Sequence, residues 1–303
     1  MSLTPSDPRL KAVIALHQSG RLAEAADGLL KLIGTHPENP GLWAHLGSLR
    51  LQQGMAGEAR EAFARAAALQ PAFAPAHAGL GQALEKLGRR VEALVSYDRA
   101  LALRPEAWIQ FNRGNLLRDL GSLDEALESY GEALRLDPGL EEALTNRGAL
   151  LLAARRKGEA LEDFERALSL RPDRPEGLNN RGNALRALGR PLEALADYDR
   201  ALSLRPDHAD SWNNRGIALQ ELGRLPEALE AYDRAIALDP AFAFAYWNKS
   251  QAKLLTGDFE EGWRLFEWRW KSATKNEARD LGRPPWLGDE ALEGKTLLVW
   301  AEQ

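Results

Sequence analysis

The chain has 303 residues, a formal net charge of −5, 45% hydrophobic residues and 27% charged residues. These are values of an ordinary globular protein, so we expect an ordered chain. The acidic balance argues against a nucleic-acid partner, because a phosphate-binding groove needs an excess of Lys and Arg. No run of about 20 apolar residues is present, so we expect no membrane span. Residues 1–10 lack the apolar core of a secretory signal.

Cysteine is absent from the chain, which excludes disulfides, thiolate nucleophiles and thiolate metal sites. The histidines are scattered without the spacing of metal ligands: His17, His36, His45, His77 and His208. We therefore expect a cytoplasmic protein that has no metal, no cofactor and no catalytic residue.

A repeated pattern of residue types runs through most of the chain. Prolines recur at intervals of 33 or 34 residues: Pro37, Pro71, Pro105, Pro138, Pro172, Pro206 and Pro240. Seventeen residues before them come Gly20, Gly54, Gly88, Gly121, Arg155, Gly189 and Gly223. Five residues after these come Ala25, Ala59, Ala93, Ala126, Ala160, Ala194 and Ala228. Aromatic residues keep the same step: Phe63, Tyr97, Tyr130, Phe164, Tyr198 and Tyr232.

Each residue type in this pattern has a structural reason. A glycine tolerates the positive φ of a tight turn that ends one helix. An alanine lets two helices approach closely, and an aromatic residue four positions later lies on the same helical face. A proline ends the second helix. The period therefore predicts two helices joined by a tight turn.

The order of residues within one period resembles the tetratricopeptide repeat. In the second period these residues are Trp43, Leu46, Gly47, Gly54, Ala59, Phe63, Ala66 and Pro71. The resemblance implies an all-α solenoid over residues 1–276, a right-handed superhelix whose first helices line a concave groove. Eight units are expected, near residues 6–39, 40–73, 74–106, 107–140, 141–174, 175–208, 209–242 and 243–276.

The sixth residue of successive units forms a pattern that indicates binding. From the fourth unit onward it is asparagine: Asn112, Asn146, Asn180, Asn214 and Asn248. A carboxamide both donates and accepts, so it can hold a backbone amide of an extended peptide. The array resembles the asparagine-lined repeats of O-linked N-acetylglucosamine transferases, which implies the same use. We predict that these five residues, called the ladder below, bind a peptide together with Asn179 and Asn213.

Another explanation of the ladder stays open at this point. The repetition can be inherited from duplication, or each side chain can hydrogen-bond to the neighbouring helix. Residues that would add specificity near the ladder are Trp108, Phe111, Trp247 and Arg186. Aromatic residues at such positions more often pack as core.

The seventh residue of the later units is basic: Arg113, Arg147, Arg181, Arg215 and Lys249. Such a stripe favours either an acidic partner or ion pairs between units. Acidic residues precede four of these cations by 15 or 16 positions: Asp98, Glu165, Asp199 and Asp233. We therefore predict ion pairs between units, with Arg147, which faces Gly131, as the exception.

The last part of the chain departs from the repeat. Phe259, Trp263, Phe266 and Trp270 have the spacing of one helical face, and most of the tryptophans lie at or after Trp247. We expect a further domain or a second copy of the chain to cover this apolar face. Residues 277–303 are expected to be a linker and the start of a truncated α/β domain, with one strand over residues 296–300.

Short motifs in this part lie within residues 257–263, 267–270, 286–288 and 292–296. They resemble bacterial tetratricopeptide proteins with a glycosyltransferase-like domain after the repeats. Our leading prediction is a protein-interaction scaffold, not an enzyme, that binds an extended peptide or a partner segment in its groove. The alternative is the substrate-presenting arm of a bacterial glycosyltransferase whose catalytic domain is missing from this chain.

Overall fold

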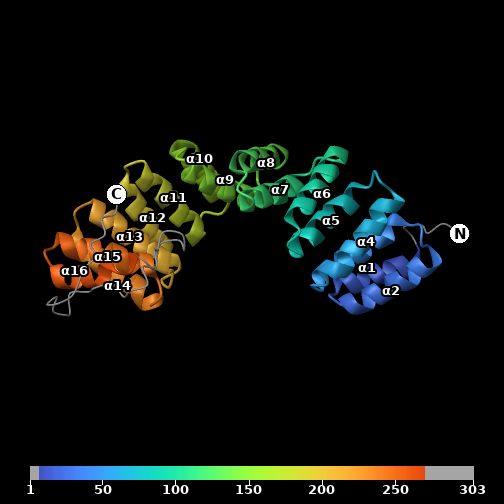
Figure 1. The fold of residues 1–303 in the computed structure, drawn as a ribbon, viewed down its shortest axis with the longest axis horizontal. Helices are drawn as coiled ribbons and strands as arrows, with labels where there is room; N and C mark the ends of the chain where they lie inside the picture. The colour runs from blue at the N-terminus through green and yellow to red at the C-terminus, as the bar shows by residue number, and fades with distance from the viewer. Residues whose placement is uncertain (1–6, 270–303) are drawn as a thin grey trace, which may run out of the picture. The chain divides into compact units, whose positions relative to one another are not determined.

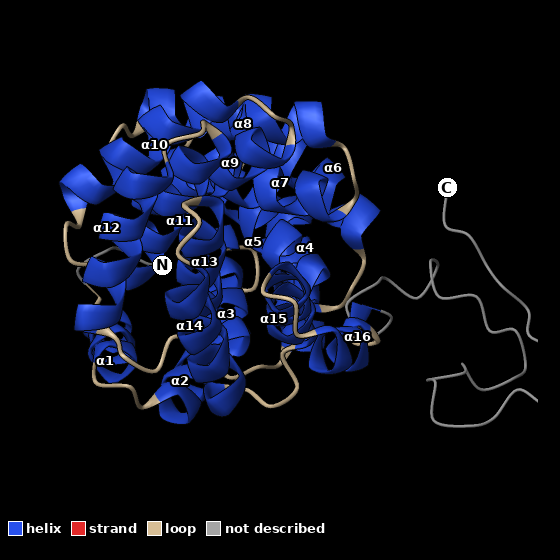
Figure 2. Ribbon diagram, turned by 90° about the vertical axis from the view of Figure 1, so that its left-hand side faces the viewer, coloured by secondary structure: helices blue, strands red, loops and turns tan. Residues whose placement is uncertain are grey.

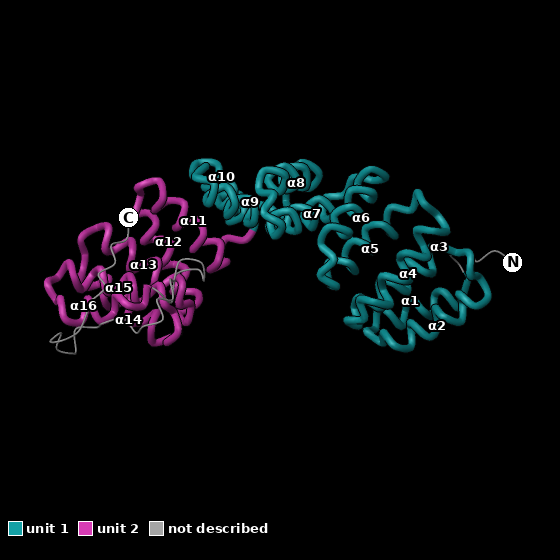
Figure 3. Tube along the Cα trace, in the orientation of Figure 1, with its two compact units in different colours: residues 1–170 teal, residues 171–303 magenta. Residues whose placement is uncertain are grey.

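The computed structural model describes residues 7–269, and in that range the regular elements are α-helices, with no strand (Figure 2). The chain divides into two compact units, residues 1–170 and residues 171–303, and each is described by itself (Figure 3). The strand predicted over residues 296–300, and the predicted domain start over residues 277–303, lie outside the described residues.

The first unit contains five consecutive pairs of helices (Figure 1). They are α1 (Pro8–Gln18), α2 (Leu22–Thr35), α3 (Pro40–Gln52), α4 (Ala56–Leu69), α5 (Ala74–Lys86), α6 (Arg90–Leu103), α7 (Ala107–Asp119), α8 (Leu123–Leu136), α9 (Glu141–Ala153) and α10 (Lys157–Leu170).

The described part of the second unit contains three further pairs. They are α11 (Pro175–Ala187), α12 (Pro191–Leu204), α13 (Ala209–Glu221), α14 (Leu225–Leu238), α15 (Ala243–Leu255) and α16 (Phe259–Phe266). Each pair falls within one of the expected units, so the prediction of an all-α array of eight helix pairs is confirmed for residues 7–269.

A left-handed residue joins the two helices of each pair. Gly54, for example, has a φ of 77°, and the amide of Met55 donates to the carbonyl of Arg50 at 2.8 Å. These bonds satisfy carbonyls that the helix end would leave unpaired. Arg155 takes the same turn with a φ of 62°, the one positive φ of a non-glycine residue among the described residues.

The predicted aromatic positions form the core between the two helices of each pair. The four tyrosines of this set are fully buried: Tyr97, Tyr130, Tyr198 and Tyr232. Each lies against a glycine of the preceding first helix, and a Cβ added to Gly182 would lie 2.6 Å from a ring carbon of Tyr198. The close approach therefore needs glycine at that point, while the ring fills the space between helices.

The first helices of neighbouring pairs also contact one another. In the first unit α3 packs against α5, and in the second unit α13 packs against both α11 and α15. Second helices contact their own partner and the first helix of the next pair, for example α12 with α11 and α13. In the second unit the first helices thus form one layer, and this layer carries Asn180, Asn214 and Asn248.

Candidate functional site

In the second unit the first helices bring the predicted asparagines together. Asn214 on α13 donates through Nδ2 to Oδ1 of Asn179 on α11, at 3.0 Å. Asn248 on α15 donates in the same way to Oδ1 of Asn213, at 2.9 Å. Asn213 Nδ2 in turn lies 3.5 Å from Asn214 Oδ1. These bonds connect three successive first helices through carboxamides alone.

The hydrogen-bonded asparagines are also connected to residues at the start of α13. Ser211 is fully buried and donates its hydroxyl to Oδ1 of Asn179 at 3.2 Å. The Oγ of Ser211 also lies 2.6 Å from Nδ1 of His208. Burial lowers the pKa of His208, with the positive charge of Arg205 as a second cause. A neutral imidazole at this position suits hydrogen bonding to a hydroxyl.

The two additional asparagines of the prediction have a different environment from the ladder itself. Asn179 and Asn213 are buried, with exposed fractions of 7% and 6%, whereas Asn180, Asn214 and Asn248 are half-buried. Asn179 and Asn213 therefore orient the ladder, and the half-buried residues present carboxamide atoms at the surface of the layer.

In the first unit the ladder residues have hydrogen-bond partners at other positions of the repeat. Asn146 on α9 donates to Oδ1 of Asn115 on α7 at 2.8 Å, because Phe111 occupies the position that corresponds to Asn179. Asn112 lies against the hydroxyl of Tyr97. The ladder residues of this unit thus also contact polar groups of the chain itself.

This geometry is compatible with both explanations of the ladder, peptide binding and hydrogen bonding to a neighbouring helix. Hydrogen bonding to a neighbouring helix is observed for Asn146, Asn214 and Asn248. Each uses one amide hydrogen for that bond, so a second N–H remains for a ligand. Asn180 is half-buried and makes no side-chain hydrogen bond within the described part of the second unit.

A second set of polar residues beside the ladder was missed by the sequence analysis. Each buried tyrosine donates its hydroxyl to the preceding first helix: Tyr97 to Glu85, Tyr130 to Asn115, Tyr198 to Asn183 and Tyr232 to Gln220, at 2.7–3.0 Å. Burial raises the pKa of the Tyr198 phenol well above its usual range. These bonds satisfy hydroxyls that would otherwise be buried without a partner.

The basic stripe is engaged within the chain. Predicted ion pairs are confirmed for Arg113 with Asp98 (2.7 Å), Arg215 with Asp199 (2.7 Å) and Lys249 with Asp233 (2.8 Å). The predicted pair of Arg181 with Glu165 would join the two units and stays a prediction. Arg181 forms two bonds with Asp197 of its own pair, at 2.5 and 2.8 Å.

Arg147 is the exception among these cations, as predicted, because the residue of the preceding pair beside it is Gly131. Its guanidinium forms two bonds with Asp163 on α10, at 2.6 and 2.7 Å, and Asp163 is buried. Gly131 offers no carboxylate on the preceding pair, so Arg147 pairs with the second helix of its own pair. Because every cation of the stripe has a carboxylate partner, the stripe does not indicate an acidic ligand.

The residues predicted to add specificity differ in their surroundings. Trp108 is partly exposed and donates its indole N–H to Glu106 at 2.5 Å. Trp247 is half-buried beside Asn248 in the sequence. Arg186 on α11 forms an ion pair with Glu221 on α13 at 2.8 Å, so its charge is balanced within the layer of first helices.

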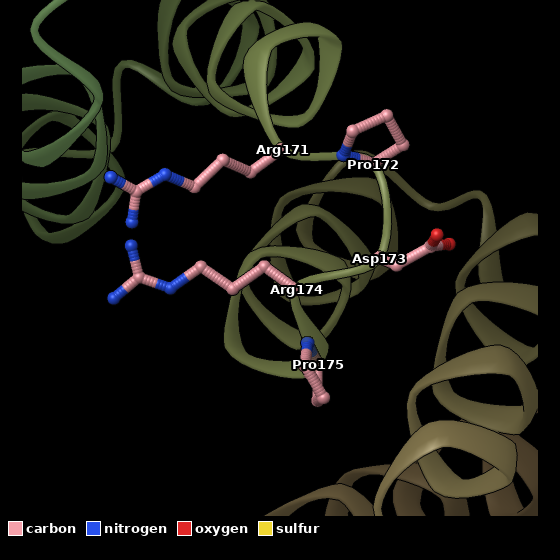
Figure 4. Close-up of a pocket in the computed structure, with 5 residues that line it drawn as sticks. All are labelled: Arg171, Pro172, Asp173, Arg174 and Pro175. Atoms are coloured by element: carbon pink, nitrogen blue, oxygen red, sulfur yellow. The ribbon is translucent and has the colours of Figure 1, made fainter.

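A separate hollow in the second unit is lined by the loop Arg171, Pro172, Asp173, Arg174 and Pro175 (Figure 4). The side chains of Arg171 and Arg174 extend to the same side, and Asp173 points away from them. Asp173 accepts a bond from Arg200 on α12 at 2.6 Å. This bond fixes the loop to its own unit, and the hollow contains no ladder residue.

The end of the described chain is apolar, as predicted. Phe259 and Trp263 on α16 are exposed by 61% and 58%. The Trp263 ring meets Phe266 edge to face, with 5.5 Å between ring centres. Trp270, the last residue of the predicted stripe, lies outside the described residues.

Two other kinds of site are absent from the described residues. Within residues 7–269, no three His, Asp or Glu side chains are grouped as they would be to hold a metal ion. None of the helices described is both long enough and apolar enough to span a bilayer.

Comparison with known sequences agrees with the register of helix pairs. Tetratricopeptide repeat models match residues 40–73, 74–107, 141–174, 179–242 and 216–261, and a TPR repeat model matches residues 114–154. No match was found among curated protein sequences. All matched models are repeat models, so they give no support to the glycosyltransferase resemblance of the C-terminal motifs.

Several solved structures share the fold. A tetratricopeptide repeat protein from Parabacteroides merdae has a TM-score of 0.62 at 21% identity, over 78% of this chain and 94% of that one. The Pseudomonas aeruginosa pilF protein has a TM-score of 0.59 at 22% identity, over 70% and 97%. The APC/C hetero-tetramer Cut9–Hcn1 gives 0.58 at 21% identity over 82% of this chain, which spans about half (49%) of that one.

Paired helices, left-handed turns and buried aromatic residues in one register define a helical-repeat scaffold. The chain belongs to the tetratricopeptide repeat family. Arrays of this family are generally non-enzymatic, and the chain is accordingly a protein-interaction scaffold.

Proposed function

We propose that the layer of first helices binds an extended polypeptide segment of a partner protein through the ladder asparagines. The observation that carries the proposal is the hydrogen-bonded row of carboxamides across α11, α13 and α15. Such a row presents equivalent polar groups at the interval of the repeat, which suits the regular backbone of an extended chain.

The chemistry of a carboxamide fits a backbone amide on both sides. Its carbonyl oxygen accepts from a peptide N–H, and its amide nitrogen donates to a peptide carbonyl. Asn180 uses neither group for a bond within the described part of its own unit. Asn214 and Asn248 keep one N–H each, and their orientation is fixed by Asn179 and Asn213. A fixed orientation reduces the entropy lost when the ligand binds.

Recognition of this kind reads the backbone more than the side chains. Arg186 and the basic residues of the stripe are already paired within the chain. Charge therefore gives little selection among ligands, and side-chain contacts at Trp247 or Trp108 would add preference. We infer a scaffold that accepts extended segments with moderate sequence dependence.

The test uses a ligand selected from a library of unstructured peptides and a measurement of affinity by fluorescence anisotropy. Asn180→Ala removes two bonds to the ligand but no hydrogen bond within the described part of its own unit. We expect about a tenfold loss of affinity, the equivalent of about 1.4 kcal/mol. The control is Ser203→Ala, an exposed position on the second helix α12, which should bind normally.

Two results would decide against the proposal. One is that Asn180→Ala and Asn214→Ala both bind the selected peptide as the unmodified chain does. The other is that Ser203→Ala weakens binding as much as Asn180→Ala, because the ligand would then contact the second helices.

A further inference from the structure

Helix α16, the last helix of the described residues, presents an aromatic face to solvent. We call Phe259 and Trp263 the α16 surface. They lie one turn apart, so they share a face of the helix, and both are more than half exposed. Large aromatic residues exposed together indicate a contact surface.

The earlier repeats show what happens at the position of Trp263. The equivalent residues are Ala26 and Arg60 in the first two pairs and leucines in the next five. Four of these leucines are Leu94, Leu127, Leu195 and Leu229. Each belongs to a core cluster that also contains a residue from the first helix of the following pair. Leu195, for example, is 7% exposed and shares its cluster with Leu219 of α13.

Trp263 is 58% exposed at the same position, and no described helix follows α16 to pack against it. Phe259 is less informative, since its equivalent Leu123 is also exposed, at 45%. In the pairs that have leucine at this position, the first helix of the next pair packs against it, so an apolar element is expected to cover Trp263 as well.

The polar surroundings of α16 are compatible with an apolar occupant. Lys249 and Lys253 are neutralised by ion pairs with Asp258 and Glu261, at 2.6–3.2 Å. The helix therefore brings no unbalanced charge from these residues next to the aromatic face. An apolar segment that contacts this face therefore does not bury Lys249 or Lys253 as an unpaired cation.

The chain itself supplies such a segment a short distance further on. Residues 286–300 contain Trp286, Leu287, Leu297, Leu298 and Trp300. A segment tethered this closely has an effective concentration on the order of millimolar, which a separate partner rarely reaches. We propose that residues 286–300 bind the α16 surface of the same chain and cover Trp263.

The absence of cysteine from the sequence gives a clean test. In the full chain, Phe259→Cys introduces a single thiol at the α16 surface, and Leu192→Cys introduces one at an exposed control position on α12 (67% exposed). We expect the thiol of Phe259→Cys to react with a maleimide at least about tenfold more slowly than the control. Adding Trp263→Ser should restore the control rate.

A second pair of variants identifies the occupant. Phe259→Cys with Leu298→Cys should form a disulfide within one chain, in higher yield than Leu192→Cys with Leu298→Cys. Equal labelling rates at the two single positions would overturn the proposal. So would equal disulfide yields in the two pairs, or disulfide-linked dimers, which would assign the surface to a second copy. Circular dichroism spectra and unfolding midpoints of all variants check that they are folded.

Discussion

Replacing Tyr198 by alanine removes a ring that the fold buries completely. The ring packs against Gly182 of α11, and its hydroxyl donates to Asn183 at 2.8 Å. Truncating a buried aromatic side chain costs about 3–5 kcal/mol, because the cavity closes only partly. We expect Tyr198→Ala to lower the free energy of unfolding by about 4 kcal/mol.

The conservative variant separates the ring from the hydroxyl. Tyr198→Phe keeps the packing and removes one neutral hydrogen bond, so it should cost about 1 kcal/mol. Asn183→Ala leaves the buried hydroxyl without its acceptor and should cost about 1–3 kcal/mol. The double variant Tyr198→Phe, Asn183→Ala should cost less than the sum of the two single changes, since both remove the same bond.

The assay is urea unfolding followed by circular dichroism, with the free energy taken from the midpoint and slope. Leu192→Ala on the same helix is the control, because Leu192 is 67% exposed and should change stability by less than about 0.5 kcal/mol. A loss below about 1 kcal/mol for Tyr198→Ala would show that the ring does not fill the core of this pair.

Three further changes test other parts of the structure. Arg155→Gly relieves a left-handed residue and should stabilise the chain by about 1 kcal/mol in the same urea assay; no gain would contradict the turn geometry. Asp163→Asn removes the charge that pairs with Arg147 and should cost about 2 kcal/mol; an unchanged midpoint would contradict a buried pair. Burial and the charge of His17 lower the pKa of His45 in the folded chain. As the pH falls, the imidazole of His45 is therefore protonated in the unfolded chain before it is protonated in the folded chain. Stability should therefore fall as the pH drops below about 6.5, less so in His45→Asn; equal pH profiles would refute this.

Much of the fold could be predicted because the same pattern of residue types recurs in successive periods, and each occurrence indicates the same pair of helices. Gly54, Ala59 and Phe63 are constrained by the turn, the close helix contact and the core, and the same constraints recur in every period. Arg155 shows the limit of the rule, since it takes the left-handed turn without being glycine.

The ion pairs show why spacing alone did not identify every partner. A basic residue of the stripe has carboxylate positions about 16 residues before and 16 residues after it, on two different second helices. Arg215 pairs with the earlier one, Asp199, and Arg147 pairs with the later one, Asp163. Arg147 has a glycine, Gly131, at the earlier position, so its partner is the carboxylate at the later position.

The polar partners of the tyrosines were missed although the sequence contains a signal. Asn183 precedes Tyr198 by 15 residues and accepts its hydroxyl. In the unit whose aromatic residue is Phe164, the corresponding residue is Ala149, which offers no acceptor. The orientation of the ladder side chains has no such signal, because it depends on rotamers that spacing does not determine.

Recognition of a peptide backbone by the ladder is tested most directly on the ligand. A peptide selected for binding is changed one residue at a time, either by methylating the backbone nitrogen or by replacing the side chain with alanine. We predict that methylation at interior positions weakens binding about tenfold, because it removes donors to the asparagine carbonyls. Alanine at the same positions should have a small effect. The opposite result, with affinity lost on alanine substitution and kept on methylation, would contradict backbone recognition by Asn180 and its equivalents.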